Sequence, residues 1–590
     1  MTYEICQRTG EGPCPSDLSR EKSKVALSYV VRALTIVVCC LVLGASQSLA
    51  EQPQPFNVLF IAADDLRTDL GCYGHPQVKT PHLDRLAQRG LLFEHAYCQQ
   101  AVCNPSRASI LTGRHVNSLR IWDLKTHFRE TTKNAVTLPE HFKNQGYFTQ
   151  NVGKIFRNWI HQIQGDPQSW SVPAQLHFAS HGTDKPQWHQ ADQPLPDNFA
   201  RDPKCECRDV PDEAYFDGRV AALAIDAMRD CATKSEPFFL AVGFWKPHSP
   251  MNAPKKYWDM YPRNKITPPP NHVWPTDAPR IAWHNSREIL GEGKNARELS
   301  EGAIQEIRDG YLANISFLDA QVGKVLAELD RLQLTERTII VFWSDHGFHL
   351  GEHTLWAKTS YFELYARVPL IIAIPDRLRL SHESQRSVGK TSSIVELLDL
   401  YPTLVELCGL EQQHECEGVS LVPLLVDPSA TIRQAALSQH PRPAYYQDQP
   451  TAMGYSIRTA SHRYTEWRDW KTGNTLATEL YDHHQDSAET VNLVNRVDVR
   501  DTVQRHAEIL SSMKPLIAPG WRTKVAADKW VRAFQRRSGL RQKSRINNRH
   551  QLEIFVFREG KSGESHYVEA QHHDSTSFFL FFFAGFKFGS

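Results

Sequence analysis

Residues 103–113 place a thiol, an arginine and two helix-boundary residues close together, in the sequence Cys-Asn-Pro-Ser-Arg-Ala-Ser-Ile-Leu-Thr-Gly. Pro105 fixes φ at a value that suits a first helical turn, and Gly113 is typical of a helix end. We therefore expect a short helix with Cys103 at its N-terminus, where unpaired N–H groups and the helix dipole favour anions. Arg107 adds a guanidinium one turn along. The segment predicts a site for an anionic substrate.

Local chemistry gives Cys103 two interpretations. The thiol could be a nucleophile that the helix terminus and Arg107 activate. It could also be an ordinary buried cysteine at the start of a core helix, which is favoured for an isolated cysteine because free thiols are among the most buried groups. These residues alone leave both interpretations open.

Two apolar runs, residues 56–63 and 338–343, are each followed by acidic residues. The first leads into Asp64 and Asp65, and the second into Asp345. Buried parallel strands deliver such side chains to one edge of a sheet. Adjacent carboxylates repel one another unless a cation lies between them, and three carboxylates make an oxygen-rich site suited to Ca²⁺ or Mg²⁺. Each strand end alone also fits a helix cap with a solvated Asp, so the metal site requires the two ends to meet.

Strands and helices alternate through most of the chain. The predicted strands are 56–63, 147–152, 237–244, 338–343 and 369–374, and the predicted helices are 138–145, 211–232 and 394–407. This alternation predicts a large three-layer α/β domain over residues 51–437. The chain has no nucleotide-binding glycine loop and no repeat of fixed period.

Three basic residues, Lys154, His248 and Lys358, lie at or just beyond predicted strands. A single lysine at a strand end is usually solvated. Ligands of open α/β sheets bind beyond the carboxyl ends of the strands, however, so the acidic and basic groups together predict one site. We expect Lys154 to be an anion clamp or proton relay and His248 to be the titrating group.

The pattern changes near Ser438. Residues 453–459, 463–467 and 478–481 predict antiparallel strands and 499–513 a helix, so we expect a small α+β subdomain over 438–525. Residues 526–590 contain a basic stretch and a phenylalanine run at 578–583. That segment fits a surface or polyanion contact, but we expect a poorly ordered tail.

The N-terminus has the features of a targeting segment. An apolar run at 33–45 follows basic residues and precedes Ser48-Leu49-Ala50, which predicts a secretory signal peptide over residues 1–50 and export to the periplasm or the outside. An uncleaved anchor is the alternative, although the run is short for a membrane span. A net charge of +1 gives no general attraction to nucleic acid.

The cysteines could form disulfides or bind a metal. Eight of the twelve follow Ala50, and an exported protein can form disulfides. Cys408 and Cys416 flank a short loop and could bridge, whereas Cys205 and Cys207 are too close for an ordinary bridge. Without a second Cys or His pair at finger spacing, a zinc site there is not expected.

Several strings occur in the order and spacing of one enzyme family. They are Asp64-Asp65-Leu66-Arg67, Gly71-Cys72-Tyr73-Gly74, Cys103-x-Pro105-Ser106-Arg107-x-x-x-Leu111-Thr112-Gly113, Val152-Gly153-Lys154, Lys246-Pro247-His248, Ser344-Asp345-His346-Gly347, Gly351-Glu352-His353, Trp356-Ala357-Lys358 and Met453-Gly454-Tyr455-Ser456-Ile457-Arg458-Thr459. From residue 56 to about 521 the chain resembles a type I sulfatase of the alkaline phosphatase superfamily, and most of all the iduronate-2-sulfatases.

The resemblance implies a modified nucleophile and a metal. Cys103 would be oxidised to formylglycine by a formylglycine-generating enzyme, and one hydroxyl of the hydrated aldehyde would attack the sulfur of a sulfate ester. Arg107 would hold this hydrate. One calcium ion would be bound by Asp64, Asp65, Asp345, His346 and the modified Cys103. Nitrogen from His346 is an unusual calcium ligand.

The resemblance also implies a substrate. Lys154, His248 and Lys358 would contact sulfate oxygens, and the substrate would be a sulfated polysaccharide carrying 2-O-sulfate on a uronic acid. Two alternatives stay open: a phosphate monoester or phosphonate hydrolase on the same fold, and an inactive protein that binds sulfated glycans. The intact Cys103 and Arg107 argue against the inactive protein.

One position departs from the family pattern. Where iduronate-2-sulfatases usually have His after Gly-Lys-Val/Ile-Phe, this chain has Arg157. A guanidinium stays protonated, so it supplies charge but not a proton. Arg157 could contact sulfate or carboxylate, His161 could replace the missing imidazole, or the substrate could differ. We expect a changed substrate contact with the chemistry retained.

Overall fold

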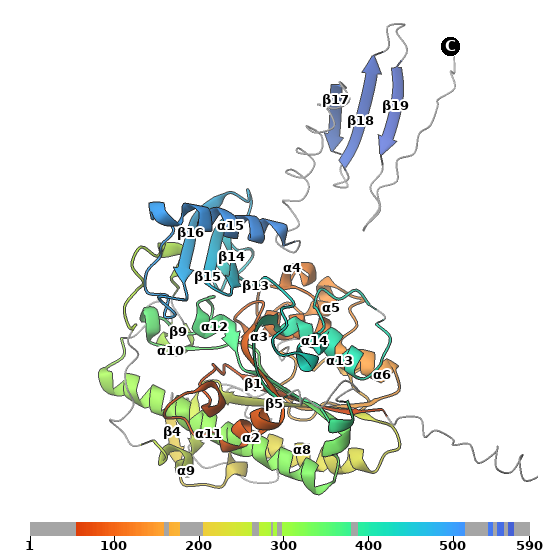
Figure 1. Ribbon diagram of the computed structural model, residues 1–590, viewed down its shortest axis with the longest axis vertical. Coiled ribbons are helices and arrows are strands. Elements are labelled where there is room, and N and C mark those ends of the chain that lie inside the picture. Colours follow the sequence, from red (N-terminus) through yellow and green to blue (C-terminus); the bar gives the residue numbers. More distant parts are fainter. Residues whose placement is uncertain are drawn as a thin grey trace, which may run out of the picture. The chain divides into compact units, whose positions relative to one another are not determined.

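The computed structural model (Figure 1) describes residues 55–157, 165–177, 205–261, 271–284, 287–291, 298–378, 388–412 and 414–513, together with three strands after residue 540. The predicted signal peptide and His161 lie outside the described residues. No helix within the described ranges has the length and apolar character needed to cross a membrane.

A central eight-stranded sheet organises the large domain. Its order is β10-β2-β11-β7-β1-β5-β3, and β12 also pairs with β2. The strands are β1 (Asn57–Asp64), β2 (Leu91–Tyr97), β3 (Phe148–Gly153), β5 (Phe238–Pro247), β7 (Thr338–Ser344), β10 (Arg367–Val368), β11 (Leu370–Ala373) and β12 (Gly389–Glu396). The four strands β7, β1, β5 and β3 run parallel, so their carboxyl ends share one edge.

Helices cover both faces of this sheet (Figure 1). One face packs on α2 (Pro81–Arg89), α8 (Phe216–Ala232) and α11 (Glu301–Arg331), and the other on α3 (Cys103–Thr112), α6 (Leu138–Asn144), α13 (Leu400–Leu407) and α14 (Val422–Val426). Along β1, Leu59 and Ile61 point into the first core, and Val58 and Phe60 into the second. A strand buried on both faces explains the uninterrupted apolar run. The predicted three-layer α/β architecture is confirmed.

One predicted helix is partly wrong. Residues 394–396 belong to β12, which pairs in parallel with β2, and α13 begins only at Leu400. The β-branched Ile394 and Val395 lie opposite His95 and Ala96 of β2. Such side chains favour a half-buried strand, so residues 394–396 pair with the sheet instead of beginning the predicted helix.

Smaller elements connect these layers. The short strands are β4 (Cys205–Arg208) paired with β6 (Met251–Pro254), and β8 (His349–Leu350) paired with β9 (Trp356–Ala357). The short helices are α4 (Val116–Leu119), α5 (Phe128–Thr131), α9 (Lys255–Trp258), α10 (Arg287–Leu290) and α12 (Glu363–Ala366). Single 3₁₀ turns occur at several connections, among them η3 (Asp212–Ala214) and η7 (Glu352–Thr354).

A second, antiparallel sheet follows, as predicted. It consists of β13 (Ala435–Arg442), β14 (Ala452–Thr459), β15 (His462–Asp469) and β16 (Thr475–Asp482), and α15 (Arg500–Ser512) packs on it. β13 begins before the boundary that we expected at 438. Ser438 Oγ donates a hydrogen bond to Cys98 O at 2.6 Å, and Gln439 N to Gln99 O at 2.8 Å. β13 therefore lies beside the segment that leads into Cys103.

The tail contains strands that we did not predict. β17 (Arg541–Ile546), β18 (Leu552–Glu559) and β19 (Ser565–Ala570) pair as a three-stranded antiparallel sheet. β18 has the sequence LEIFVFRE, whose β-branched and aromatic residues favour a strand. The basic stretch and the phenylalanine run did not point to these strands, and the order of the tail as a whole stays a prediction.

Cys408 and Cys416 are both free thiols. Cys416 Sγ donates to Gly113 O at 3.3 Å, so it packs against the end of α3 instead of bridging to Cys408. The Cys408–Cys416 disulfide that we considered is therefore not formed. A side chain at Gly113, which has φ of 63°, would collide with Cys416 Sγ.

Candidate active site

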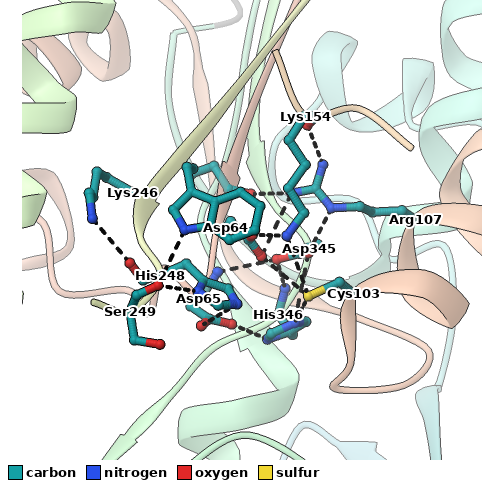
Figure 2. Close-up of polar contacts among 12 residues, drawn as sticks. Asp64, Asp65, Cys103, Arg107, Lys154, Lys246, His248, Ser249, Asp345 and His346 are labelled. Atoms are coloured by element: carbon teal, nitrogen blue, oxygen red, sulfur yellow. Dashed lines mark hydrogen bonds and ion pairs between the residues drawn. The ribbon is translucent and has the colours of Figure 1, made fainter. Parts of the chain in front are cut away.

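Figure 2 shows polar side chains converging at the carboxyl edge of the parallel strands. Asp64 is the last residue of β1, Lys154 follows β3, His248 follows β5 and Asp345 follows β7. Cys103 enters from the N-terminus of α3. All of these side chains are buried. The strand ends that the sequence placed at one edge therefore do form one cluster.

Cys103 lies at the centre of the cluster. Its Sγ is 3.5 Å from Asp64 Oδ1, 3.4 Å from His346 Nε2 and 3.7 Å from Lys154 Nζ. Burial and the neighbouring Asp64 raise the pKa of the thiol to about 11. Because the thiolate is the nucleophilic form of cysteine, this environment opposes an activated thiol. Of the two interpretations of Cys103, the structure disfavours the thiol nucleophile.

The predicted metal ligands are brought together. Asp64, Asp65, Asp345, His346 and Cys103 are all buried, and four of them, Asp64, Cys103, Asp345 and His346, offer ligand atoms within 4.8 Å of one another. Asp65 belongs to a second, overlapping group with Asp64, Cys103 and His248. Three carboxylates in a buried site fit a hard divalent cation such as Ca²⁺.

Asp65 has a left-handed backbone, with φ of 64°. This conformation is costly for a residue with a side chain, and it persists where neighbouring groups enforce it. Tyr311 Oη donates to Asp65 O at 2.7 Å, and Asp65 N donates to Asp345 Oδ1 at 3.3 Å. These contacts turn the Asp65 side chain toward the cluster.

The hydrogen bonds of His346 indicate its tautomer. Nδ1 lies 3.0 Å from Gly347 O, and a carbonyl oxygen can only accept. Nδ1 therefore carries the proton, and Nε2, which faces Cys103 Sγ at 3.4 Å and Asp345 Oδ2 at 3.7 Å, has the free lone pair. A metal-binding histidine needs this arrangement.

Arg107 is a fully buried clamp between strand ends. Its Nε donates to Asp345 Oδ2 at 2.8 Å, and Nη1 and Nη2 donate to the carbonyl oxygens of Lys154 (2.6 Å), Ile155 (3.0 Å) and Ala63 (3.0 Å). The guanidinium thereby ties α3 to the ends of β1, β3 and β7. Its planar fork suits this role.

Two lysines neutralise the adjacent aspartates. Lys154 Nζ forms an ion pair with Asp64, and Lys358 Nζ lies 3.1 Å from each carboxylate oxygen of Asp65. Burial alone would raise the pKa of Asp64, but the charges of Lys154 and Arg107 hold it well below its ordinary value. Burial raises the pKa of Asp65 well above its ordinary value, and Lys358 opposes this only in part.

His248 contacts Lys358. Its Nδ1 donates to Ser249 O at 2.8 Å, so Nε2 accepts from Lys358 Nζ at 2.9 Å. Burial and then the charge of Lys358 hold the pKa of His248 well below its ordinary value, which keeps the imidazole neutral. Lys246 instead bonds the carbonyl oxygen of Pro250 at 2.7 Å and so steadies the loop that follows His248.

Arg157 lies at the rim of the cluster. Its Nη1 donates to Leu124 O at 2.8 Å. Burial lowers the pKa of Arg157, and the interactions with Cys103 and Asp64 oppose this in part. The role of Arg157 as a substrate contact stays a prediction.

Glu288 of α10 also lies in this site, although it was not predicted from the sequence. Its carboxylate lies 3.0 Å from Lys358 Nζ and 3.7 Å from His248 Nε2, and Ser249 Oγ donates to it at 2.6 Å. Glu288 does not follow a predicted strand, and no motif contains it, so no sequence signal pointed to it.

Comparisons with known proteins agree with this geometry. The profile of the sulfatase family matches residues 56–410, and that of the C-terminal region of N-sulphoglucosamine sulphohydrolase matches residues 351–515. The chain is similar to iduronate 2-sulfatase of Homo sapiens, at 35% identity over 78% of this chain and 95% of the human protein. It is also similar to a sulfatase of Formosa agariphila, at 29% identity over 79% of this chain and 87% of that protein.

Solved structures share the fold. Phosphonate monoester hydrolase of Agrobacterium radiobacter superimposes with a TM-score of 0.63 at 22% identity, covering 84% of this chain and 99% of that one. A 2-O glycosaminoglycan sulfatase superimposes with a TM-score of 0.56 at 19% identity, over 78% and 91% of the two chains. With a family profile that spans most of the chain, the protein belongs to the sulfatase family and is a sulfuric ester hydrolase of the alkaline phosphatase-like fold.

Proposed function

We propose that this protein is an exported, calcium-dependent sulfatase that removes 2-O-sulfate from a uronic acid of a sulfated polysaccharide, using formylglycine made from Cys103. The observation that carries the proposal is the position of Cys103 Sγ, which has Asp64, His346 and Lys154 within 3.7 Å. The 2-O specificity is supported by 35% identity with human iduronate 2-sulfatase along nearly all of that protein.

Each residue has a chemical task in this proposal. Asp64, Asp65, Asp345 and His346 would hold calcium, which when bound stabilises negative charge as a Lewis acid. Formylglycine at position 103 would supply the hydroxyl nucleophile. Lys154 and Lys358 place positive charge where sulfate oxygens gain negative charge, and a fixed cation in a buried site is effective there.

The leaving alcohol needs a proton. Lys358 Nζ lies 2.9 Å from His248 Nε2 and donates a hydrogen bond to the lone pair of that nitrogen. Burial lowers the pKa of His248 and keeps its imidazole neutral, so Lys358 carries the proton that the leaving alcohol would take, and His248 orients the Lys358 ammonium. The Lys358–His248 pair is thus placed to pass a proton to an ester oxygen bound beside it.

Two experiments on one preparation test the proposal. Peptide mass spectrometry across position 103 should show a species roughly 18 Da lighter than the cysteine peptide. The same protein should release sulfate from 2-O-sulfated uronic acid disaccharides, and Cys103→Ala should abolish that release. Cys98→Ala is a matched control, because Cys98 is an equally buried thiol whose Sγ contacts Tyr365 O.

Other outcomes separate the alternatives. Active protein without the lighter peptide would refute the formylglycine route. Release of phosphate but not sulfate from matched aryl esters would identify a phosphate or phosphonate ester hydrolase. Modified protein that releases no sulfate but retains sulfated glycans on a column would be a glycan-binding protein.

A further inference from the structure

A fourth carboxylate, that of Glu288, faces the proposed sulfate-binding groups. It lies 3.0 Å from Lys358 Nζ and 3.7 Å from His248 Nε2. The other three carboxylates of the site, those of Asp64, Asp65 and Asp345, belong to the two overlapping candidate metal groups. Glu288 belongs to neither group, and its carboxylate contacts Lys358 and His248, the two residues assigned to the anion.

The position of Glu288 is fixed from two directions. The next residue of α10, Ile289, is only 2% exposed and packs in the main hydrophobic core. Ser249 Oγ donates to Glu288 Oε1 at 2.6 Å, and Ser249 directly follows His248. These contacts hold the carboxylate beside Lys358 and His248.

The negative charge of Glu288 repels negative charge on a bound substrate. An anion oxygen that accepts from Lys358 Nζ lies about 3 Å from it, and so within about 6 Å of Glu288. At that separation in a buried site, each additional negative charge on the substrate is repelled appreciably. A sulfate ester carries one negative charge, whereas a phosphate monoester carries nearly two at neutral pH.

We infer that Glu288 is a specificity residue that admits monoanionic esters and rejects dianionic ones. It allows Lys358 and His248 to hold a sulfate ester, and it makes the same pocket unfavourable for a phosphate monoester of equal shape. This inference rests on the proposed function, because it assigns Lys358 and His248 to the transferred group.

Three esters with one leaving group test it: 4-nitrophenyl sulfate and methyl 4-nitrophenyl phosphate, which are monoanions, and 4-nitrophenyl phosphate, which is the dianion. In Glu288→Gln, kcat/KM for the dianion relative to both monoanions should rise about tenfold. Glu301→Gln, which removes an exposed glutamate of α11, should leave the ratio unchanged. Ser249→Ala, which removes the anchor, should raise the ratio by a smaller factor.

The outcomes are distinct. If Glu288→Gln changes kcat/KM for all three esters by the same factor, Glu288 only supports Lys358, and the inference is overturned. If kcat/KM falls for the dianion alone, the inference is also overturned. If the wild-type protein releases no sulfate from 4-nitrophenyl sulfate or from the 2-O-sulfated disaccharides, the proposed function itself fails, whatever the Glu288→Gln variant does.

Discussion

Arg107 Nε donates to Asp345 Oδ2 at 2.8 Å, and neither side chain is exposed to solvent. The two residues are far apart in sequence, one on the first turns of α3 and the other after β7. Because the same guanidinium also bonds the carbonyl of Ala63 at the end of β1, it fixes the relative positions of Cys103 and of both acidic strand ends. The site depends on this one cation for its geometry.

Arg107→Lys should therefore damage both stability and catalysis. An ammonium cannot reproduce the four bonds to Asp345, Lys154, Ile155 and Ala63, and it leaves a buried carboxylate poorly compensated. We expect a loss of about 3 kcal/mol in unfolding free energy and at least a ~100-fold loss of sulfate release. Denaturant titration and initial rates measure the two effects. The control is Arg89→Lys at a half-exposed position, which should change the unfolding free energy by under about 0.5 kcal/mol. If Arg107→Lys has no larger effect than this control, Arg107 does not hold the strand ends together.

Calcium should stabilise the fold as well as support activity. Three buried carboxylates that share a cation repel one another once it is removed. At a calcium concentration of ~100 times Kd, binding should add about 2.7 kcal/mol to the unfolding free energy. The test is Tm as a function of calcium after treatment with a chelator. Asp345→Asn should reduce both the shift and the activity.

The second sheet supplies the control for calcium. Glu363, His483 and Glu489 form another group of the type that can hold a metal, but Arg463 already forms ion pairs with both glutamates. Glu489→Gln should therefore leave the calcium-dependent shift of Tm unchanged. If the calcium-dependent shift of Tm disappears in Glu489→Gln and persists in Asp345→Asn, the ion binds at Glu363, His483 and Glu489. The calcium site proposed around Asp345 would then be contradicted.

The acidic strand ends were predictable because their signal is local. An apolar run that ends in carboxylates, as β1 ends in Asp64, specifies a buried parallel strand and the edge at which it delivers the side chain. The parallel pairing of β1 with β7 then places Asp64 and Asp345 together.

The contacts of Glu288 were not predictable by the same reasoning. Glu288 meets Ser249 across 39 residues, and its short helix α10 has no amphipathic period long enough to identify. The secondary structure of residues 394–396 was also hard to predict, because the short apolar run with Ile394 and Val395 fits both a buried helix and a buried strand. Their pairing with β2 decided between the two, and pairing with a distant strand is absent from local sequence.

Acid should weaken the contact between the second sheet and the large domain through Glu489. Burial alone would raise its pKa, but Arg463 and His483 lower it from the ordinary 4.5 to about 2. A carboxyl with a lowered pKa in the fold stabilises the protein fully above its unfolded pKa, and this contribution disappears as pH falls through the folded pKa. We expect a loss of about 3 kcal/mol between pH values of about 4.5 and 2.

The measurement is unfolding free energy against pH in the wild type and in Glu489→Gln. The variant should be less stable at neutral pH and should lose less stability in the acid range. Glu406→Gln, an exposed glutamate of α13, should follow the wild-type curve. Parallel acid curves for the wild type and Glu489→Gln would show that the ion pair with Arg463 does not contribute.

Arg157→His should change which sugars are cleaved rather than whether sulfate is cleaved. Arg157 keeps its charge at the rim near Cys103 and bonds Leu124 O at 2.8 Å, so it can attract a sulfate or carboxylate of the substrate but cannot donate a proton to the leaving group. With 4-nitrophenyl sulfate, which lacks the sugar, kcat should stay within about tenfold. With disaccharides that differ in sulfate position and in the uronic acid carboxylate, the ranking of kcat/KM should change.

Arg89→His serves as the matched control, since Arg89 lies on α2 and pairs with Asp330. It should alter neither the aryl sulfate rate nor the ranking. A ranking that is the same for the wild type and Arg157→His would place the determinant of sugar choice elsewhere. A large rise in kcat for all substrates would show instead that the imidazole restores an acid–base step that this chain lacks. Each result identifies a different task for the residue at position 157, because charge without a transferable proton acts on binding and an imidazole acts on the leaving group.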